Sequence, residues 1–409
     1  MKCRHCKEKL KLPLINLGSA PPSNAYLSNQ TLHSPERWFP LRVLVCERCW
    51  LVQTEDFAEA DYLFDKEYAY FSSFSTSWLQ HSKQYVNDMI ERFSLNKKSH
   101  VIEIAANDGY LLQYVKKANI PCTGIEPTSK AAQAARKKGI DIIESFFGVK
   151  LAKELVKKGK QADLITAKNV LAHVPDINDF VKGVSLLLKP QGKVTFEFPH
   201  LLNLINKHQF DTIYHEHFSY LSLTTLETIF KKNGLQIFDV EEQPTHGGSL
   251  RLFAQRYDTG LLSVSKKVND LTKKEIKAGI RTRDYYKNFQ KKANIIKDNL
   301  LSFLIKAKKN NKKVVAYGAA AKGNTLLNYA GIRPDLVNYV VDRNPNKQNK
   351  FMPGSRIPIR DEFFLKKDNP DYILILPWNL KNEIIKQIVS NTNFAGKFVI
   401  AIPKLEIIE

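Results

Sequence analysis

The sequence predicts an α/β protein in three parts, because cysteines crowd its first fifty residues and two later stretches alternate between apolar strands and amphipathic helices. The expected parts are a small cysteine-rich module at residues 1–66, a central Rossmann-like domain at 67–265 and a smaller C-terminal Rossmann-like domain at 266–409. A chain of 409 residues is too long for one ordinary domain. Alternation of strand and helix implies a mostly parallel sheet with helices on both faces.

The first part is marked by two Cys-x-x-Cys pairs, Cys3 with Cys6 and Cys46 with Cys49, whereas the rest of the chain holds only Cys122. Four thiolates in two close pairs supply the tetrahedral ligand set of a structural zinc ion. The alternatives are a pair of redox dithiols and a disulfide framework. Both are disfavoured, because a redox Cys-x-x-Cys usually occurs once, at the start of a helix, and because structural disulfides are rare in a reducing cytosol.

The proline-rich stretch between Cys6 and Cys46 is longer than in a plain zinc ribbon. We expect it to form an extended loop between two zinc knuckles. His5 lies inside the first pair, but four thiolates complete the coordination shell, so we expect His5 at the surface.

The central part alternates regularly from residue 78 onwards. The expected helices repeat apolar residues at helical spacing, and the expected strands are short apolar runs. A Gly-Gly turn joins two further strands within 235–257. Helices are expected at 78–93, 107–120, 129–139, 148–159 and 177–188, and strands at 100–106, 122–127, 140–145, 162–170 and 193–199.

Residues 266–310 contain few helix breakers and keep one apolar stripe from Phe289 to Leu304 at helical spacing, so they predict one long connecting helix. A second alternating unit follows. It has expected strands at 312–320, 336–345 and 371–379, and an expected helix at 322–331. This pattern predicts the smaller Rossmann-like domain.

The charge balance is basic, with 62 Lys and Arg against 41 Asp and Glu and a net charge of +21. Such a charge raises nucleic acid as a partner. The lysines, however, occur as scattered doublets that mostly close predicted helices, where a cation favours the negative end of the helix dipole. Solvated lysine-rich faces and an acidic small-molecule substrate explain the charge without nucleic acid. The absence of a signal peptide and of a long apolar run predicts a cytoplasmic protein without membrane contact.

A cofactor turn is predicted at residues 101–109, VIEIAANDG, where a strand ends and a helix begins. Its expected cofactor-binding residues are Glu103, Ala105, Asn107 and Gly109. Small side chains there allow the backbone to pass close to a ligand.

Glu126 ends the following strand, and a carboxylate at that place can accept hydrogen bonds from both hydroxyls of a ribose. Asn169, next to Lys168 at the end of the fourth strand, is expected against the same ligand. The Gly-x-Gly-x-x-Gly pattern of dinucleotide sites is absent, which favours S-adenosylmethionine over NAD. The alternative is a tight turn with a surface acid and no ligand.

The segment FDTIYHEHFSYLS carries the densest set of acid–base groups, Tyr214, His215, Glu216, His217 and Tyr220. Two histidines, a carboxylate and two phenols offer a base, an orienting acid and proton carriers. Tyr214 and His217 share a face if the segment turns helically. A metal site is disfavoured because no further ligand cluster is evident. Other polar groups expected nearby are His173, His246, Tyr68 and Tyr70.

These motifs carry a resemblance to a known family. The chain resembles the sugar C-methyltransferases that act on nucleotide-linked 4-keto-deoxysugars, such as the 3-C-methyltransferases of antibiotic and surface-polysaccharide pathways. The resemblance covers all three parts and departs from the family at Ala106, where we expect serine or glycine. It rests on the paired CxxC motifs with CWLVQ, EYAYFSS, EIAANDGYLL, NVLAHVPD, FDTIYHEHFSYLS, HGGSLR, AYGAAAKGNTLLNYAG, VDRNPNKQ and ILPWN.

The resemblance implies a class I methyltransferase domain and a mechanism. A base removes the C3 proton of a nucleoside-diphosphate 4-keto-6-deoxy sugar, and the enolate takes the methyl group of S-adenosylmethionine. The implied base is His217, with Glu216 and Tyr214 orienting it or stabilising the enolate oxygen, and with His173 and Tyr68 in the same pocket. Such a step needs a base near neutral pKa and a donor for the oxyanion. Whether His217 or Tyr214 takes the proton stays open.

The resemblance also implies substrate contacts. The turn after Gly318 could present backbone N–H groups and Lys322 to a pyrophosphate, although a purely structural packing turn is an equal alternative. The zinc ion is expected to be structural and remote from the chemistry. The expected substrate-binding residues are Tyr70, His246, Arg251, Lys322 and Asn324.

A second function class is a zinc-containing nucleic-acid-binding protein or RNA methyltransferase. The paired cysteines and the net charge favour it. The dispersed basic residues, and the lack of an alternating aromatic and basic stripe, disfavour it. The sequence leaves the nucleotide, the sugar, the pathway and the oligomeric state open, a monomer being one option.

Overall fold

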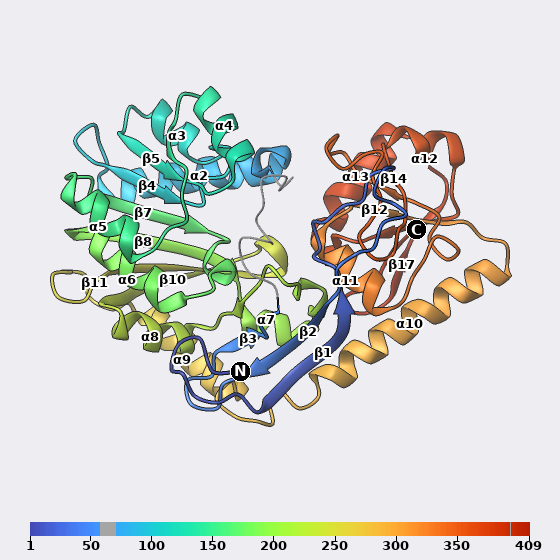
Figure 1. Cartoon of the computed structure of the whole chain (residues 1–409), viewed down its shortest axis with the longest axis horizontal. Helices are drawn as coiled ribbons and strands as arrows, with labels where there is room; N and C mark the ends of the chain where they lie inside the picture. The colour runs from blue at the N-terminus through green and yellow to red at the C-terminus, as the bar shows by residue number, and fades with distance from the viewer. Residues whose placement is uncertain (58–70, 393) are drawn as a thin grey trace.

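The computed structural model describes residues 1–57, 71–392 and 394–409. Two lobes, each built around its own sheet, stand side by side, and the N-terminal strands lie at the base between them (Figure 1). The first lobe holds a seven-stranded sheet and the second a six-stranded sheet, whereas the basal sheet has four strands.

The seven-stranded sheet has the order β10-β11-β8-β7-β4-β5-β6. Strands β4 to β8 pair in parallel, and β11 runs antiparallel to both of its neighbours. The predicted Rossmann-like sheet and its final hairpin are therefore confirmed. The strands are β4 (Val101–Ile104), β5 (Cys122–Ile125), β6 (Asp141–Ile143), β7 (Ala162–Lys168), β8 (Leu188–Pro199), β10 (Leu235–Gln243) and β11 (Ser249–Arg256).

Helices cover both faces of this sheet, as parallel strands require. Val101 and Ile102 of β4 point to opposite sides and enter two different apolar cores. Helices α2 (Thr76–Phe93), α3 (Leu112–Lys117) and α4 (Ser129–Lys137) build one core, and α5 (Val149–Lys157), α6 (Ile177–Leu187) and α8 (Leu223–Lys232) build the other. The short helix α7 (Leu201–Asn206) follows β8.

The stretch between Cys6 and Cys46 is not the extended loop that the sequence predicts. It contains β1 (Leu12–Ala20) and β2 (Phe39–Val45), which pair antiparallel. Strand β1 is the edge of its sheet, where a proline such as Pro13 costs no ladder hydrogen bond. Pro21, Pro22 and Pro35 lie in the loop that joins the two strands, so the proline content predicted this loop but not the strands on either side of it.

The fourth strand of the basal sheet comes from elsewhere in the chain. Strand β3 (Val52–Thr54) pairs antiparallel with β9 (Ser219–Tyr220), which directly follows the predicted acid–base segment. The basal sheet also packs into two cores. Leu44 and Leu51 join the core of the first lobe, while Leu14, Val43 and Val52 join the core that includes α10 and the second lobe.

The predicted single helix over 266–310 is two helices, α9 (Lys266–Ala278) and α10 (Phe289–Lys309). Gly279 ends α9 in the left-handed conformation, with φ of 93°, which glycine adopts at low cost. The apolar stripe of α10 is buried as predicted, from Phe289 to Leu304.

The second lobe has the sheet order β14-β13-β12-β15-β16-β17, parallel except for β17, which confirms the smaller Rossmann-like unit. The order reverses between β12 and β15, and crevices at such points are where ligands bind in open α/β sheets. The elements are β12 (Val314–Tyr317), α11 (Ala321–Tyr329), β13 (Val340–Val341), β14 (Ile359–Arg360), α12 (Phe363–Asp368), β15 (Tyr372–Ile375), α13 (Lys381–Asn391), β16 (Lys397–Ile400) and β17 (Glu406–Ile408).

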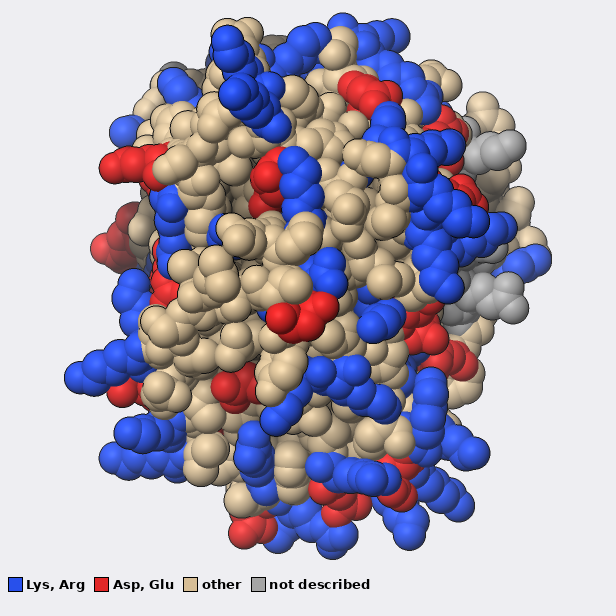
Figure 2. All heavy atoms as spheres, turned by 90° about the vertical axis from the view of Figure 1, so that its left-hand side faces the viewer, with Lys and Arg blue, Asp and Glu red and all other residues tan. Residues whose placement is uncertain are grey.

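Charge is distributed on the surface in small groups. On the face that Figure 2 shows, Lys and Arg surround an area of uncharged side chains, and Asp and Glu lie among them. The lysine doublets of α3, α4, α5, α8 and α10 close their helices as predicted. Within the described ranges, none of the helices has both the length and the apolar character needed to span a bilayer.

Candidate functional site

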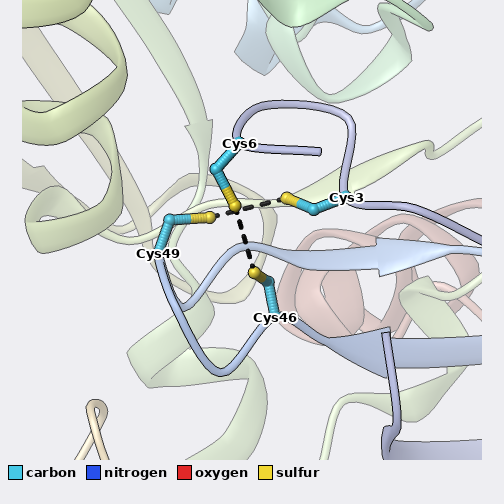
Figure 3. A group of neighbouring side chains, drawn as sticks. All are labelled: Cys3, Cys6, Cys46 and Cys49. Atoms are coloured by element: carbon cyan, nitrogen blue, oxygen red, sulfur yellow. Dashed lines mark hydrogen bonds between the residues drawn. The ribbon is translucent and has the colours of Figure 1, made fainter. Parts of the chain in front are cut away.

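The four N-terminal cysteines converge on one point. Cys3 and Cys6 approach from the first loop, and Cys46 and Cys49 from the turn after β2, with all four side chains directed inwards (Figure 3). The four sulfur atoms lie within 4.8 Å of one another. The closest contacts are 3.5 Å from Cys3 Sγ to Cys49 Sγ and 3.4 Å from Cys6 Sγ to Cys46 Sγ, and all five cysteines of the chain are free thiols.

This donor set fits a zinc ion. Tetrahedral coordination at about 2.3 Å places sulfur atoms roughly 3.8 Å apart, close to the spacing in this cluster. Hydrogen bonds from Cys46 and Cys49 lower the pKa of Cys3, so one thiolate is favoured even before a cation binds. Each of these close contacts joins a cysteine of one motif to a cysteine of the other, whereas a redox dithiol pairs the two cysteines of one motif. The arrangement therefore contradicts two separate redox dithiols.

The cluster is buried against the first lobe. His5 is not the surface residue that the sequence predicts, since its ring is buried and its Nδ1 lies 2.7 Å from Asn178 Oδ1 in α6. Gln53 Nε2 donates to Cys3 Sγ at 3.4 Å. The thiol site is therefore fixed to both β3 and α6.

A cavity of about 710 Å³ lies between the two lobes. Its walls come from the carboxyl ends of β4, β5 and β7, from the acid–base segment, and from the loops after β12 and β15. Ten predicted site residues line it together. They are Ala105, Asn107, Glu126 and Asn169 from the cofactor set, His173, Tyr214, Glu216 and His217 from the catalytic set, and His246 and Lys322 from the substrate set.

Four predicted residues do not line the cavity. Glu103 is buried within β4, and burial raises its pKa well above the usual value. Gly109 serves packing, because a Cβ on it would lie 2.4 Å from Ile140 Cδ1 and its φ is 74°. Arg251 is engaged by Glu197 and Glu241, each at 3.0 Å. Asn324 is buried in α11, where its Oδ1 accepts from Asn328 Nδ2 at 3.2 Å.

Tyr68 and Tyr70 lie outside the described residues.

The cofactor turn is fixed by Glu126. Its carboxylate accepts from the backbone N–H of Asn107 at 2.9 Å and from the backbone N–H of Thr128 at 2.9 Å. Ala105 and Asn107 have left-handed backbone, with φ of 59° and 49°. Burial raises the pKa of Glu126. Ala106 lies against Gly124, where an added Cβ would be 2.7 Å from the Ala106 Cβ, so a small residue is required at both positions.

A buried ionic network supports the same wall and was not predicted. Glu197 of β8 binds Lys168 at 3.1 Å, Arg251 at 3.0 Å and His81 Nε2 at 2.7 Å. Burial opposes ionisation of Glu197, but the Lys168 ammonium and the hydrogen bond with His81 hold its pKa well below the usual value. Burial lowers the pKa of Lys168 to about 8. Pairing with these cations is what makes a carboxylate tolerable at this depth.

Trp78 and His81 of α2 line the cavity beside this network, and their rings stack at 5.1 Å. The sequence shows them only as members of an amphipathic helix. A tryptophan and a histidine one turn apart at the start of that helix are the sequence signal that could have indicated these two cavity residues.

His217 is held as a neutral imidazole. Its Nδ1 donates to the Thr212 carbonyl at 2.8 Å, because a carbonyl only accepts. Burial, with a further contribution from His173, lowers the pKa of His217 well below its usual value. The imidazole is therefore uncharged with a lone pair on Nε2, which lies 2.9 Å from the Tyr214 hydroxyl. Tyr214 and His217 lie at the two ends of a backbone turn, in which the His217 N–H donates to the Tyr214 carbonyl at 2.9 Å.

Two further acid–base groups complete the cluster. His173 Nδ1 donates to the Glu216 carbonyl at 2.8 Å, its ring centroid is 4.6 Å from that of His217, and burial lowers its pKa to about 4. Glu216 Oε2 accepts from Asn24 Nδ2 at 2.8 Å, and burial raises the pKa of Glu216 to about 8. Glu216 is thus a carboxylic acid at neutral pH and can donate a proton.

His215 lies outside the cavity, with Nε2 3.1 Å from the Phe39 carbonyl. It is the structural histidine of the segment.

The second lobe contributes cations to the cavity. Lys322 Nζ donates to Asn379 Oδ1 at 3.1 Å and lies 4.6 Å from the centroid of the Trp378 ring. Trp378 Nε1 in turn donates to Asp211 Oδ2 at 2.7 Å, three residues before Tyr214. The lysine-bearing loop is thereby tied to the acid–base segment.

The chain matches three family models. The model described as "Putative zinc binding domain" matches residues 3–64, "Methyltransferase domain" matches residues 78–240, and "C-methyltransferase C-terminal domain" matches residues 244–403. Among curated proteins, the chain is similar to C-methyltransferase NovU of Streptomyces niveus. The two are 33% identical over 407 residues, which cover 100% of this chain and 96% of NovU.

Other similarities are partial. Ubiquinone biosynthesis O-methyltransferase of Bordetella avium (strain 197N) is 29% identical over 98 residues, 24% of this chain and 41% of that protein. Among solved structures, PH0226 from Pyrococcus horikoshii OT3 is 15% identical with a TM-score of 0.38, over 49% of this chain and 100% of that one. A likeness at this TM-score carries no inference about function.

The four-cysteine cluster predicts about one zinc ion per chain in metal analysis of the purified protein. Cys46→Ser should release the zinc and lower the melting temperature, because metal binding contributes directly to the folding of so small a module. Cys122→Ser is the matched control and should keep the zinc. A protein without zinc, or with a disulfide among these four cysteines, would contradict the assignment.

Proposed function

The chain belongs to the C-methyltransferase family, which uses S-adenosylmethionine, and on that premise we propose that it methylates C3 of a nucleoside-diphosphate 4-keto-6-deoxy sugar. The observation that carries this proposal is a single cavity with the cofactor turn on one wall and the neutral His217 on another. A screen of nucleoside-diphosphate keto-sugars, read by mass, tests it. The expected result is a gain of one methyl group, and methylation of RNA alone would overturn it.

The reaction needs a carbon nucleophile, which proton abstraction supplies. The adjacent ketone acidifies the C3–H bond, so a neutral imidazole can remove this proton. Electrons of the broken C–H bond then delocalise onto the ketone oxygen as an enolate. S-adenosylmethionine, when bound, would supply the methyl group for the new C–C bond, and its sulfonium sulfur would become a neutral thioether.

We assign the base to His217. Its Nε2 carries the lone pair, and Thr212 keeps it in that tautomer. The Tyr214 hydroxyl donates to this nitrogen, so in the proposed reaction the substrate C3–H displaces that hydrogen bond, which frees the phenol to donate to the enolate oxygen. His173 packs beside His217, with ring centroids 4.6 Å apart, and burial keeps His173 itself uncharged at neutral pH.

The remaining wall residues suit the two ligands. In the proposed arrangement Glu126 accepts from the ribose hydroxyls of the cofactor, with Asn107, Ala105 and Asn169 around it. On the opposite side Lys322 meets the pyrophosphate of the substrate at the start of α11. His246, which accepts from Asn169 Nδ2 at 3.1 Å, lines the same cavity. The free thiols support a cytoplasmic location, where cysteines stay reduced.

Glu126→Gln should weaken binding of S-adenosylmethionine by roughly 1.5–3 kcal/mol, because it removes the charge from the hydrogen bonds to the ribose and leaves one side-chain oxygen, in place of two, to accept from the turn. Glu126→Ala should weaken it further. Calorimetry with S-adenosylmethionine measures the effect. Glu144→Gln, at the exposed end of the next strand, is the control. Unchanged affinity in the Glu126 variants would remove the assignment.

His217→Asn should lower kcat by roughly 10²–10⁴-fold, the usual contribution of a general base, while both ligands still bind. Asparagine preserves a donor towards Thr212. Tyr214→Phe should slow the reaction by about 10²-fold and leave residual activity. His215→Asn, which alters the neighbouring histidine outside the cavity, should stay active. An active His217 variant beside a dead Tyr214 variant would make the phenol the base.

Glu216 should impose an alkaline limit on the rate. Its pKa of about 8 means that the carboxyl group donates a proton below this pH and becomes an anion above it, where it opposes the enolate charge. The rate should therefore fall as pH rises through about 8. Glu216→Gln should remove that fall, whereas Glu227→Gln on α8 should not. A Glu216→Gln enzyme with the same alkaline limb would contradict this role.

A further inference from the structure

Arg4 stands inside the first Cys-x-x-Cys pair, yet its guanidinium serves groups outside that loop. Its Nε donates to the Phe218 carbonyl at 3.3 Å, Nη1 to the Pro175 carbonyl at 3.1 Å and Nη2 to the Thr54 carbonyl at 3.1 Å. Asp56 forms an ion pair with the same group. The side chain is only 5% exposed.

Two of these carbonyls belong to the segments that carry the histidines of the cavity. Phe218 directly follows His217, and Pro175 comes two residues after His173. The guanidinium carbon also lies 4.8 Å from the centroid of the Phe218 ring. The Phe218 N–H donates to the Ala172 carbonyl at 2.8 Å, so the two histidine segments are themselves joined where Arg4 holds them.

Strand β3 adds a second connection to the same place. The Thr54 hydroxyl donates to the His217 carbonyl at 2.6 Å, and the Thr54 N–H donates to the Phe218 carbonyl at 3.1 Å. Gln53 accepts from the Arg4 N–H at 2.8 Å and donates to Cys3 Sγ at 3.4 Å. A continuous set of hydrogen bonds therefore runs from a metal-ligating sulfur to the backbone of His217.

The second cysteine pair shows that the metal cluster itself does not need such an arginine. Arg48 occupies the corresponding loop between Cys46 and Cys49, but its side chain is 70% exposed and its nearest acid, Glu8, is 4.0 Å away. The buried contacts of Arg4 are thus not a general feature of the zinc knuckle.

We propose that Arg4 is a positioning residue, whose contacts fix His173 and His217 in place relative to the zinc knuckle. The guanidinium presents five donors in a fixed plane, which lets it hold three carbonyls at once, and a lysine cannot reproduce that fork. The metal site then sets where the two imidazoles sit as well as stabilising the N-terminal module. The effect on the rate rests on the function proposed above, whereas the positions of the two rings do not.

The experiment compares Arg4→Lys and Arg4→Gln with Arg48→Lys and Arg48→Gln in the full-length, zinc-loaded protein. Zinc content, melting temperature and calorimetric affinity for S-adenosylmethionine show whether each variant is folded. Imidazole ¹⁵N spectra then report the tautomers of His173 and His217, and steady-state rates give kcat and KM separately. Thr54→Val, which removes the hydroxyl contact alone, replaces the Arg4 variants if those lose zinc.

The expected result for the Arg4 variants is full zinc and an unchanged cofactor affinity. The Nδ1–H tautomer of His173 and His217 should become mixed, and kcat should fall at least about tenfold, because misplacement by about 1 Å is costly in catalysis. The Arg48 variants should match the wild type in every measurement. Unchanged imidazole spectra in folded Arg4 variants and in Thr54→Val would overturn the proposal. Altered spectra in a protein that methylates no keto-sugar would instead overturn only the proposed function.

Discussion

The pairing of β3 with β9 is the contact on which the rest of the site depends. It makes the N-terminal module and the acid–base segment parts of one sheet, so the thiol cluster and His217 are separated by a few buried hydrogen bonds. The same sheet places one set of apolar side chains in the core of the first lobe and another in the core that includes α10 and the second lobe. A module too small to form its own core thereby holds the two walls of the cavity together. None of the four cysteines lines the cavity, and that the metal is remote from the chemistry stays a prediction.

Burial is the second constraint, and it determines the protonation states in the cavity. Desolvation disfavours every charged form, so His173, His217 and His246 stay neutral while Glu216 holds its proton. The Lys322 ammonium group lines the same cavity, and its positive charge further lowers the pKa of His217. The same cation suits an anionic nucleotide. An uncharged imidazole and an electropositive wall therefore arise from one arrangement.

Local signals predicted much of this structure. The cysteine spacing indicated the metal site, the alternation indicated both Rossmann-like units, and the density of YHEH indicated the acid–base cluster. The features that the sequence did not reveal depend on contacts between residues far apart in the chain.

Strand β9 is two residues long and exists only because β3 lies beside it. Glu103 and Arg251 have the chemistry of site residues, but their pairing and burial keep them out of the cavity. Arg4 and Arg48 each lie between the two cysteines of a pair, at the first and the second intervening position, and only the fold shows that Arg4 is buried while Arg48 is exposed. The break between α9 and α10, by contrast, has a local signal in Gly279, whose left-handed backbone ends α9.

The most direct test of the central claim, that His217 acts as a neutral base towards a carbon acid, is proton exchange without methyl transfer. The enzyme is incubated in deuterated water with a nucleoside-diphosphate 4-keto-6-deoxy sugar and no S-adenosylmethionine, and the C3 proton is followed by NMR. If His217 is the base, the C3 signal disappears in the wild type and persists in His217→Asn, with the sugar otherwise intact. Exchange at the same rate in both proteins would contradict it.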